Sequence, residues 1–291
     1  MINLRRIWSG GMLSMVAIFA YAQSHYGTTG LMNMPTGEMQ RDKTFMFGGN
    51  FLSKHTTVPR WWYDTWNYYI NITFFPWMEV GYMCTLHKAV PTDYGNRSGY
   101  WVPSTYHKFV NQDRSFHFRL RVWKEGWWKS WTPQVVFGSN DAIGDSSNGG
   151  SLTHQAEQSY GNGFWTRYYL AMTKHVEYEN WSKLGLHLAW IYSRRFDNRL
   201  NNPAIGIDFQ PTLKDDDWAV RNILNRLKLM VEVIPGYTSV KPDLTFDEDQ
   251  SMYQVNCGLY VSLWRDYMNA TVELDKGRFF SAGLQFKVHL K

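Results

Sequence analysis

The most regular feature of the chain is an alternation of apolar and polar side chains over residues 280–290. Every even position in this stretch is apolar, and the odd positions carry polar residues or glycine. A period of two places the two kinds of side chain on opposite faces of a β-strand. The same alternation recurs upstream, for example in residues 116–122 and 184–190. The expected strands span residues 44–53, 66–75, 77–88, 115–124, 131–139, 165–175, 183–193, 203–211, 227–235, 252–264, 267–275 and 279–290.

The connections between these twelve expected strands differ in length in a regular way. Short turns are expected near residues 75–77, 124–126 and 265–266, and the longer polar connections are residues 53–65, 89–114, 140–164, 194–202 and 236–251. This alternation is typical of an all-β, antiparallel up-and-down β-barrel that crosses a membrane, with tight turns at one end. An even number of strands puts the N- and C-termini of the barrel on the same side, which we expect to be the periplasm. Two connections do not follow this alternation of short and long. One is an Asp-rich segment at 214–226, expected to be partly helical, on the short-turn side, and the other is a tight turn at 276–277 on the opposite side.

The first 22 residues have the features of a secretory signal peptide. Arg5 and Arg6 precede an apolar run, and Ala20-Tyr21-Ala22 fits the small-x-small pattern before a cleavage site. A membrane anchor is the alternative, but the run is short for a spanning helix and is interrupted by serines and glycines. We therefore expect cleavage after Ala22, a periplasmic entry segment at residues 23–43, and one barrel domain at residues 44–291 in the outer membrane. The entry segment could plug the barrel or dock a partner.

Composition favours a membrane barrel over a soluble β-sandwich, which also alternates but buries its apolar face. Aromatic residues make up 17% of the chain, with 15 Trp and 18 Tyr, and barrels place such residues at the two membrane interfaces. After Ala22 no stretch approaches the apolar length of a membrane helix, and the mean hydropathy is −0.43, so a helical membrane protein is excluded. A barrel remains possible, because half of each strand faces away from lipid. Outer-membrane lipid and lipopolysaccharide are therefore the expected partners. A net charge of +5 is too small to indicate nucleic acid.

Charged side chains recur on the polar face of the expected strands, which would face the barrel lumen. These candidates are His117, Arg119, Arg121, His187, Asp208, Lys228, Glu232, Glu273, Lys287 and His289. One interpretation is a polar conduit for an anionic or neutral glycan. The other is a network of paired charges that fills the barrel, because buried charges need partners. Twelve strands lie between small filled barrels and open porins, which favours the filled lumen.

Aromatic residues also cluster in the first two long connections. Trp61, Trp62, Tyr63, Tyr100 and Trp101 could stack on sugar rings, but an interfacial girdle is the favoured explanation, because barrels place Trp and Tyr there routinely. Cys84 and Cys257 fall on the apolar phase of their strands, where they either face lipid or form a disulfide.

The sequence contains little that indicates catalysis. Ser151 and His154, with Asp141 and Asp145 nearby, form a weak candidate for a nucleophile and base in a Gly-rich connection. No sequence motif for a metal or a cofactor is present, so none is expected.

Several stretches resemble the YjbH family of outer-membrane proteins. Gly30, Leu31, Pro35, Thr36 and Met39 match the family's opening pattern G-L-x-x-x-P-T-x-x-M. Further matches are residues 69–81, with an aromatic-Pro turn before E-V-G, and residues 113–116, 124–126, 202–211 and 255–259. Many relatives are longer, and some are lipoproteins, whereas this sequence lacks a cysteine near the expected cleavage site.

The resemblance implies an outer-membrane β-barrel linked to secretion or assembly of surface polysaccharide, with polysaccharide and periplasmic secretion factors as partners. It implies no catalytic residues. The first hypothesis is therefore a non-enzymatic barrel that supports exopolysaccharide or capsule export. The alternatives are a pore for small solutes and a barrel hydrolase that acts on lipid or glycan.

Overall fold

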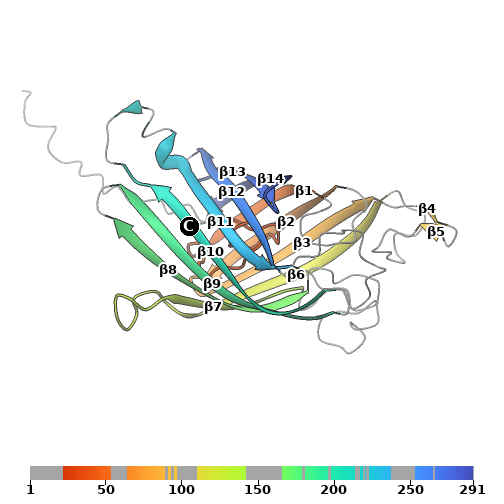
Figure 1. Ribbon diagram of the computed structural model, residues 1–291, viewed down its shortest axis with the longest axis horizontal. Coiled ribbons are helices and arrows are strands. Elements are labelled where there is room, and N and C mark those ends of the chain that lie inside the picture. The colour runs from red at the N-terminus through yellow and green to blue at the C-terminus, as the bar shows by residue number, and fades with distance from the viewer. Residues whose placement is uncertain are drawn as a thin grey trace, which may run out of the picture.

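The computed structural model describes residues 22–53, 64–88, 91–92, 95–96, 110–141, 166–178, 181–195, 198–213, 217–218, 220, 223–236, 253–264 and 266–290. Twelve strands form a closed antiparallel barrel in which sequence neighbours are also neighbours in space (Figure 1). They are β1 (Thr44–Leu52), β2 (Thr65–Phe75), β3 (Met78–Lys88), β6 (Val110–Trp123), β7 (Gln134–Asn140), β8 (Arg167–Tyr178), β9 (Ser182–Arg195), β10 (Asn198–Pro211), β11 (Leu227–Pro235), β12 (Tyr253–Trp264), β13 (Met268–Asp275) and β14 (Phe279–His289). The expected up-and-down barrel of about twelve strands is confirmed.

The barrel closes where its first and last strands meet. β1 pairs with β14 from Thr44 opposite His289 to Phe51 opposite Ala282. Both strands therefore reach the rim that carries the short connections, which we call the short-turn end. The opposite rim carries most of the long connections and is called the long-loop end. A separate two-stranded hairpin, β4 (Pro91–Thr92) with β5 (Gly95–Asn96), lies between β3 and β6 in the sequence.

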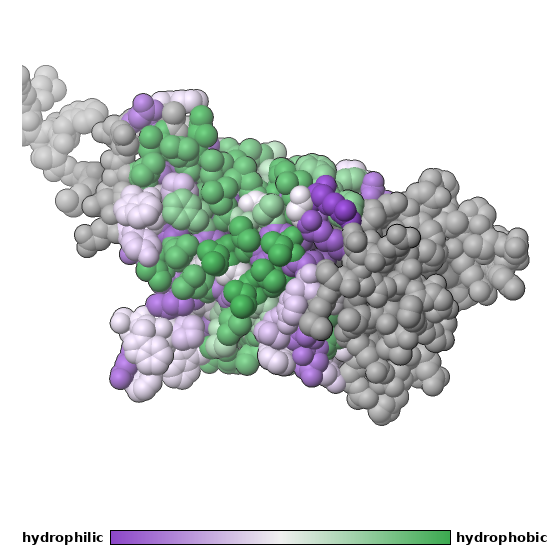
Figure 2. All heavy atoms as spheres, in the orientation of Figure 1, coloured by the Kyte–Doolittle hydropathy of each residue, from purple (hydrophilic) through white to green (hydrophobic). Residues whose placement is uncertain are grey.

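The outer surface of the barrel is apolar and the inner surface is polar. On β2 the side chains of Trp66, Tyr68 and Ile70 are exposed, while those of Asn67 and Asn71 are buried. A soluble sandwich has the reverse arrangement, because its apolar face is its core. Figure 2 shows the apolar residues spread over the middle of the barrel wall. An apolar band around a closed antiparallel barrel is what a bilayer requires.

Large aromatic side chains gather at the short-turn end. Trp127, Trp128 and Trp131 belong to the connection between β6 and β7 and are 62–68% exposed. Trp181 and Trp264, in or beside other short connections, are also exposed. Tryptophan at this level is typical of a membrane interface, which agrees with the expected aromatic girdle.

Some element boundaries differ from the prediction for identifiable reasons. Residues 194–202 were expected to form a long connection, but β9 and β10 pair from Arg195 opposite Asn198 onward. The asparagines there suggested a loop. However, Leu200 is buried and Asn201 is exposed, so buried and exposed side chains continue to alternate as they do in a strand. The strand expected at 131–139 begins instead at Gln134, after Pro133, because proline cannot donate a ladder hydrogen bond.

Within the segment 214–226 the structure describes residues 217–218, 220 and 223–226. Among its described residues, the structure contains a short 3-10 helix, η4 (Leu224–Arg226). No helix among the described residues has the length and apolar character needed to span a membrane.

Residues 22–40, which precede β1, lie inside the barrel. Every residue of this segment is buried, whereas residues 41–43 are exposed at the short-turn end. We call residues 22–40 the plug. Plugging the barrel and docking a partner were the two roles expected for the entry segment at residues 23–43. The burial of residues 22–40 corresponds to the first role.

Candidate functional site

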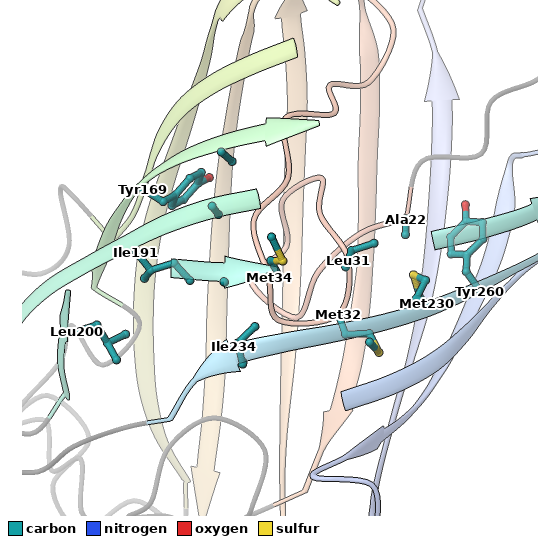
Figure 3. Packing of buried hydrophobic residues seen from close by; sticks show 13 residues of the cluster. Ala22, Leu31, Met32, Met34, Tyr169, Ile191, Leu200, Met230, Ile234 and Tyr260 are labelled. Carbon is teal, nitrogen blue, oxygen red and sulfur yellow. The ribbon is translucent and has the colours of Figure 1, made fainter. Parts of the chain in front are cut away.

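The plug contacts opposite walls of the lumen. Its apolar residues Leu31, Met32 and Met34 belong to one cluster with wall residues of β8 to β12, including Tyr169, Ile191, Met230 and Tyr260 (Figure 3). Its polar contacts are spread over β2, β3, β6, β8, β11 and β13. The plug therefore has an apolar tip that matches an apolar part of the wall and a polar body that matches the rest.

On one wall, a buried ion pair holds two parts of the plug. The guanidinium of Arg119 on β6 lies 3.0 Å from a carboxylate oxygen of Glu79 on β3, and both side chains are fully buried. The Glu79 carboxylate accepts hydrogen bonds from the backbone N–H and the hydroxyl of Thr29, at 2.8 and 2.9 Å. Arg119 donates to the backbone carbonyls of Thr36 and Glu38. Both charges thus have a partner, and each also binds the plug.

On another wall, a single carboxylate binds the tip of the plug. The carboxylate of Glu232 on β11 accepts the backbone N–H groups of Met32, Asn33 and Met34, at 2.9–3.2 Å. Successive N–H groups that point to one anion form a nest, which stabilises negative charge without a cation. The amide of Asn256 donates a further hydrogen bond at 2.8 Å. Glu232 therefore fixes the position of the plug's turn.

Near the short-turn end, Glu38 of the plug joins a network of ionisable side chains. Its carboxylate lies 3.1 Å from the ring of His175 and 3.5 Å from the ammonium of Lys228. Lys228 also lies 3.0 Å from Asp208, which is 2.6 Å from His187. Burial alone would raise the pKa of Glu38, but the Lys228 ammonium and the His175 ring hold it well below its ordinary value. The plug thus contributes a charged group to this network.

Two glycines in the wall make room for the apolar tip. A Cβ atom added at Gly206 on β10 would lie 2.4 Å from Leu31, and one at Gly258 on β12 would lie 2.6 Å from the sulfur of Met32. Normal van der Waals contact requires about 3.5–4.0 Å. These positions therefore accept the plug's side chains only because they lack side chains of their own.

Further contacts reach the plug from β8 and β13. The Arg167 guanidinium donates to the backbone carbonyl of Asn33 at 2.9 Å and stacks 3.4 Å from the ring centre of Tyr26. The ring of His25 lies 2.6 Å from the carboxylate of Glu273. Together these contacts tie the plug to the wall along much of its length.

The structure places all ten predicted lumen residues on the inward phase of their strands. Arg119, Lys228, Glu232 and Glu273 contact the plug, and His187 and Asp208 lie beside Lys228. His117 instead bonds to Asn140 and Asp141, and Lys287 to Tyr260 and Asp266. These eight are buried, whereas Arg121 and His289 are only half-buried.

The five residues of the family-like pattern lie together in the plug. Gly30 and Pro35 form a β-bridge that closes a tight turn, and Leu31 lies at its tip. Thr36 follows and accepts the Arg119 hydrogen bond through its carbonyl, and Met39 is buried farther along. The pattern therefore describes a turn that fits inside the barrel.

Among the residues that hold the plug in place, sequence reasoning missed Glu79, Arg167, Glu38 and His25. Glu79 and Arg167 lie on the inward phase of their strands, so strand alternation could have found them. Glu38 and His25 belong to a segment without periodicity, and their partners are far away in the sequence. No sequence signal pointed to them.

Other predicted features fall outside the described residues. These are the aromatic residues Trp61, Trp62, Tyr63, Tyr100 and Trp101, the catalytic candidates Ser151, His154 and Asp145, and the signal peptide up to residue 21. Asp141 is described and is buried beside His117 and Thr166. Cys84 and Cys257 are free thiols, so the disulfide alternative is not adopted.

Comparison with known proteins supports the resemblance seen in the sequence. Residues 22–152 match the sequence profile of the YjbH family, described as exopolysaccharide biosynthesis protein YbjH. The uncharacterized lipoprotein YjbH of Escherichia coli (strain K12) is 27% identical over 124 residues, which are 42% of this chain and 15% of that protein. This chain therefore matches only a small part of that relative.

A solved structure with a partly similar arrangement is a bacterial polysaccharide outer membrane secretin. It covers 87% of this chain and 100% of its own, with 7% sequence identity and a TM-score of 0.34. At this TM-score, the fold assignment rests on the strand pairing of the chain itself.

Proposed function

Because residues 22–152 match the YjbH family of exopolysaccharide biosynthesis proteins, we propose that this chain is a non-enzymatic outer-membrane barrel that supports export or assembly of an exopolysaccharide or capsule. The observation that carries the proposal is the location of the family-like pattern. Its residues form the turn that Glu232 binds inside the lumen. Part of what the chain shares with the family therefore lies where a transported polymer would have to pass.

In this proposal the plug keeps the barrel closed until a polymer or a secretion factor engages it. Displacing the plug uncovers a lumen wall rich in carboxylate, guanidinium and amide groups, such as those of Glu79, Arg119 and Asn71. These groups exchange their bonds to the plug for bonds to hydroxyl-rich sugars. A buried polar group left without a partner costs about 1–3 kcal/mol. A ligand or water must therefore bind to the wall groups as the plug leaves them.

The proposed orientation places the short-turn end in the periplasm and the long connections at the cell surface. The plug then enters from the periplasmic side, where secretion factors would reach residues 41–43. Lipopolysaccharide and outer-membrane lipid contact the apolar band. Accessibility of engineered cysteines in the β6–β7 connection to a membrane-impermeant reagent on whole cells tests this orientation. Labelling of these cysteines in cells with an intact outer membrane would mean that the short-turn end lies at the cell surface.

The proposal is tested by export in a strain from which the gene has been deleted. The full chain should restore surface polysaccharide, measured by a glycan-specific stain and by quantifying sugar released from washed cells. A barrel that starts after residue 43, behind the same signal peptide, should assemble but change the amount or the timing of export. Unchanged export would remove the proposed role of the plug, and unchanged export in the deletion strain would refute the function.

The two alternative functions make different demands. A pore for small solutes requires an open lumen at rest, whereas the plug here contacts opposite walls. A hydrolase requires convergence of Ser151 and His154, which lie outside the described residues. Incubating the purified protein with surface polysaccharide or lipid and measuring product size separates a hydrolase from a barrel without catalytic activity.

A further inference from the structure

A histidine of the plug and two carboxylates of β13 form a buried cluster. One ligand atom from each of His25, Glu273 and Asp275 lies within 4.8 Å of the others, and all three residues are buried. Histidine nitrogen and carboxylate oxygen are both ligands of divalent transition metals, Zn²⁺ in particular. The cluster joins two elements that the sequence separates by more than 200 residues.

The closest contact in the cluster joins His25 to Glu273. The Nε2 atom of His25 lies 2.6 Å from the Oε2 atom of Glu273. The Nδ1 atom of His25 has no hydrogen-bond partner among the described residues. A Zn²⁺ ion at about 2.0–2.1 Å from each ligand atom would replace this direct contact and move the two atoms apart.

The charge around His25 is also favourable for a cation. The carboxylates of Glu273, Asp275 and Glu232 all act electrostatically on this ring. Asp275 is oriented by hydrogen bonds from the amide of Asn33 and the hydroxyl of Ser281. Such outer contacts are typical of metal ligands, whose orientation they fix.

A second cluster in the lumen provides a comparison. Glu38, His187 and Asp208 also lie within 4.8 Å of one another. The ammonium of Lys228 lies 3.0 Å from Asp208 and 3.5 Å from Glu38, so a cation of the protein already occupies this place. His187 also makes a hydrogen-bonded contact with Asp208 at 2.6 Å. This cluster is complete without a metal.

We propose that His25, Glu273 and Asp275 form a binding site for a divalent transition-metal ion, with Zn²⁺ as the preferred ion, that fastens the plug to β13. The imidazole supplies a nitrogen ligand and the carboxylates supply oxygen ligands. A metal that prefers oxygen ligands alone, such as Ca²⁺, binds more weakly there. The site depends only on the placement of the plug in the barrel, so it holds whether or not the barrel exports polysaccharide.

The test is Zn²⁺ binding to the purified, tag-free full chain in detergent after treatment with a chelator. Calorimetry and elemental analysis should give one tightly held Zn²⁺ per chain and much weaker Ca²⁺ binding. His25→Gln and Glu273→Gln should each weaken Zn²⁺ binding by more than roughly tenfold, in line with the loss of a metal-site contact. His117→Gln, which removes a buried imidazole that bonds to Asn140 and Asp141 rather than to the plug, should leave binding unchanged.

Several results would overturn the site. They are the absence of Zn²⁺ binding by the wild-type chain, equal binding by the His25→Gln variant, or a loss of binding in His117→Gln as large as that in His25→Gln. The difference in electrophoretic mobility between unheated and heated samples shows whether each variant has folded. Should Glu273→Gln fail to fold, His25→Gln still decides the matter, because His25 lies outside the barrel strands.

Discussion

The side chains of Arg119 and Glu79 form a buried ion pair at 3.0 Å, and each also binds a different part of the plug. Glu79 accepts hydrogen bonds from Thr29, and Arg119 donates to the carbonyls of Thr36 and Glu38. Because both charges are fully buried, removing one leaves the other without compensation. This pair therefore couples the stability of the barrel wall to the presence of the plug.

The first prediction concerns Arg119→Met, which removes the charge but keeps the length of the side chain. We expect a loss of about 3–5 kcal/mol in the free energy of unfolding, since breaking a buried pair leaves a buried carboxylate unpaired. Urea unfolding in lipid vesicles, followed by tryptophan fluorescence, measures the loss. Arg121→Met, at a half-buried position on the same strand, is the matched control and should have a clearly smaller effect. Equal effects would mean that the pair has no special role.

The second prediction uses the glycine that faces the tip of the plug. Gly206→Ala places a methyl group 2.4 Å from the present position of Leu31, so we expect destabilisation of about 1–3 kcal/mol from overpacking. Leu31→Ala in the same chain makes room for the new methyl group. The double variant should therefore be less destabilised than the sum of the two single variants. Additive losses would indicate that Leu31 and Gly206 are not in contact.

The third prediction concerns ion flow through the barrel in planar bilayers. The wild-type chain should show low conductance, because the plug contacts opposite walls of the lumen. Deleting residues 23–40 should raise the conductance in long-lasting openings. Trp127→Ala, which changes only the outer aromatic surface, should behave like the wild type. A large, steady conductance of the wild-type chain would contradict a closed resting state.

The fourth prediction concerns the effect of acid on the β6–β7 connection. Burial would raise the pKa of Glu125, but hydrogen bonds from the His175 ring and the Lys174 ammonium lower it to about 2. Because this pKa is below the ordinary value of 4.5, the carboxylate stabilises the fold above pH 4.5. That contribution is lost as the pH falls toward 2.

Urea midpoints at different pH values check this expectation. At pH 6 the wild-type chain should be more stable than Glu125→Gln, and the difference should shrink between pH 4.5 and 2. A constant difference across this range would show that the charge of Glu125 does not stabilise the connection.

The fifth prediction concerns the start of the mature chain. Cleavage after Ala22 makes Gln23 the first residue, at the buried end of the plug. The intact mass of the protein extracted from outer membranes should correspond to residues 23–291. A mass that retains the apolar run would indicate a membrane anchor instead.

The barrel could be predicted from the sequence because its strands obey a local rule. Residues 116–122 and 184–190 alternate strictly, and lipid on one side and a polar lumen on the other both require this period. The rule also placed Lys228 and Glu232 on the inner face. It failed at Asn198–Asn202 because asparagines suggested a loop, although one buried leucine maintained the alternation.

The plug could not be placed from the sequence, because its position depends on contacts between distant residues. Met34 and Glu232 are separated by 198 positions, and Asn33 and Asp275 by 242. A segment without periodicity gives no indication of which wall it will contact. The family-like pattern around Gly30 and Pro35 marked the segment, and plugging the barrel was one of two roles expected for it, but no pattern showed which wall residues it would contact.

The exposed residues 41–43 join the plug directly to β1, and Lys43 accepts a hydrogen bond from the backbone N–H of Leu290 at 2.8 Å. A displaced plug therefore stays tethered at the mouth of its own binding site. Its return is a unimolecular step with a high effective concentration, independent of how many copies the membrane holds. Whatever opens the barrel must compete with this tether continuously, and the lumen closes again once the competitor departs.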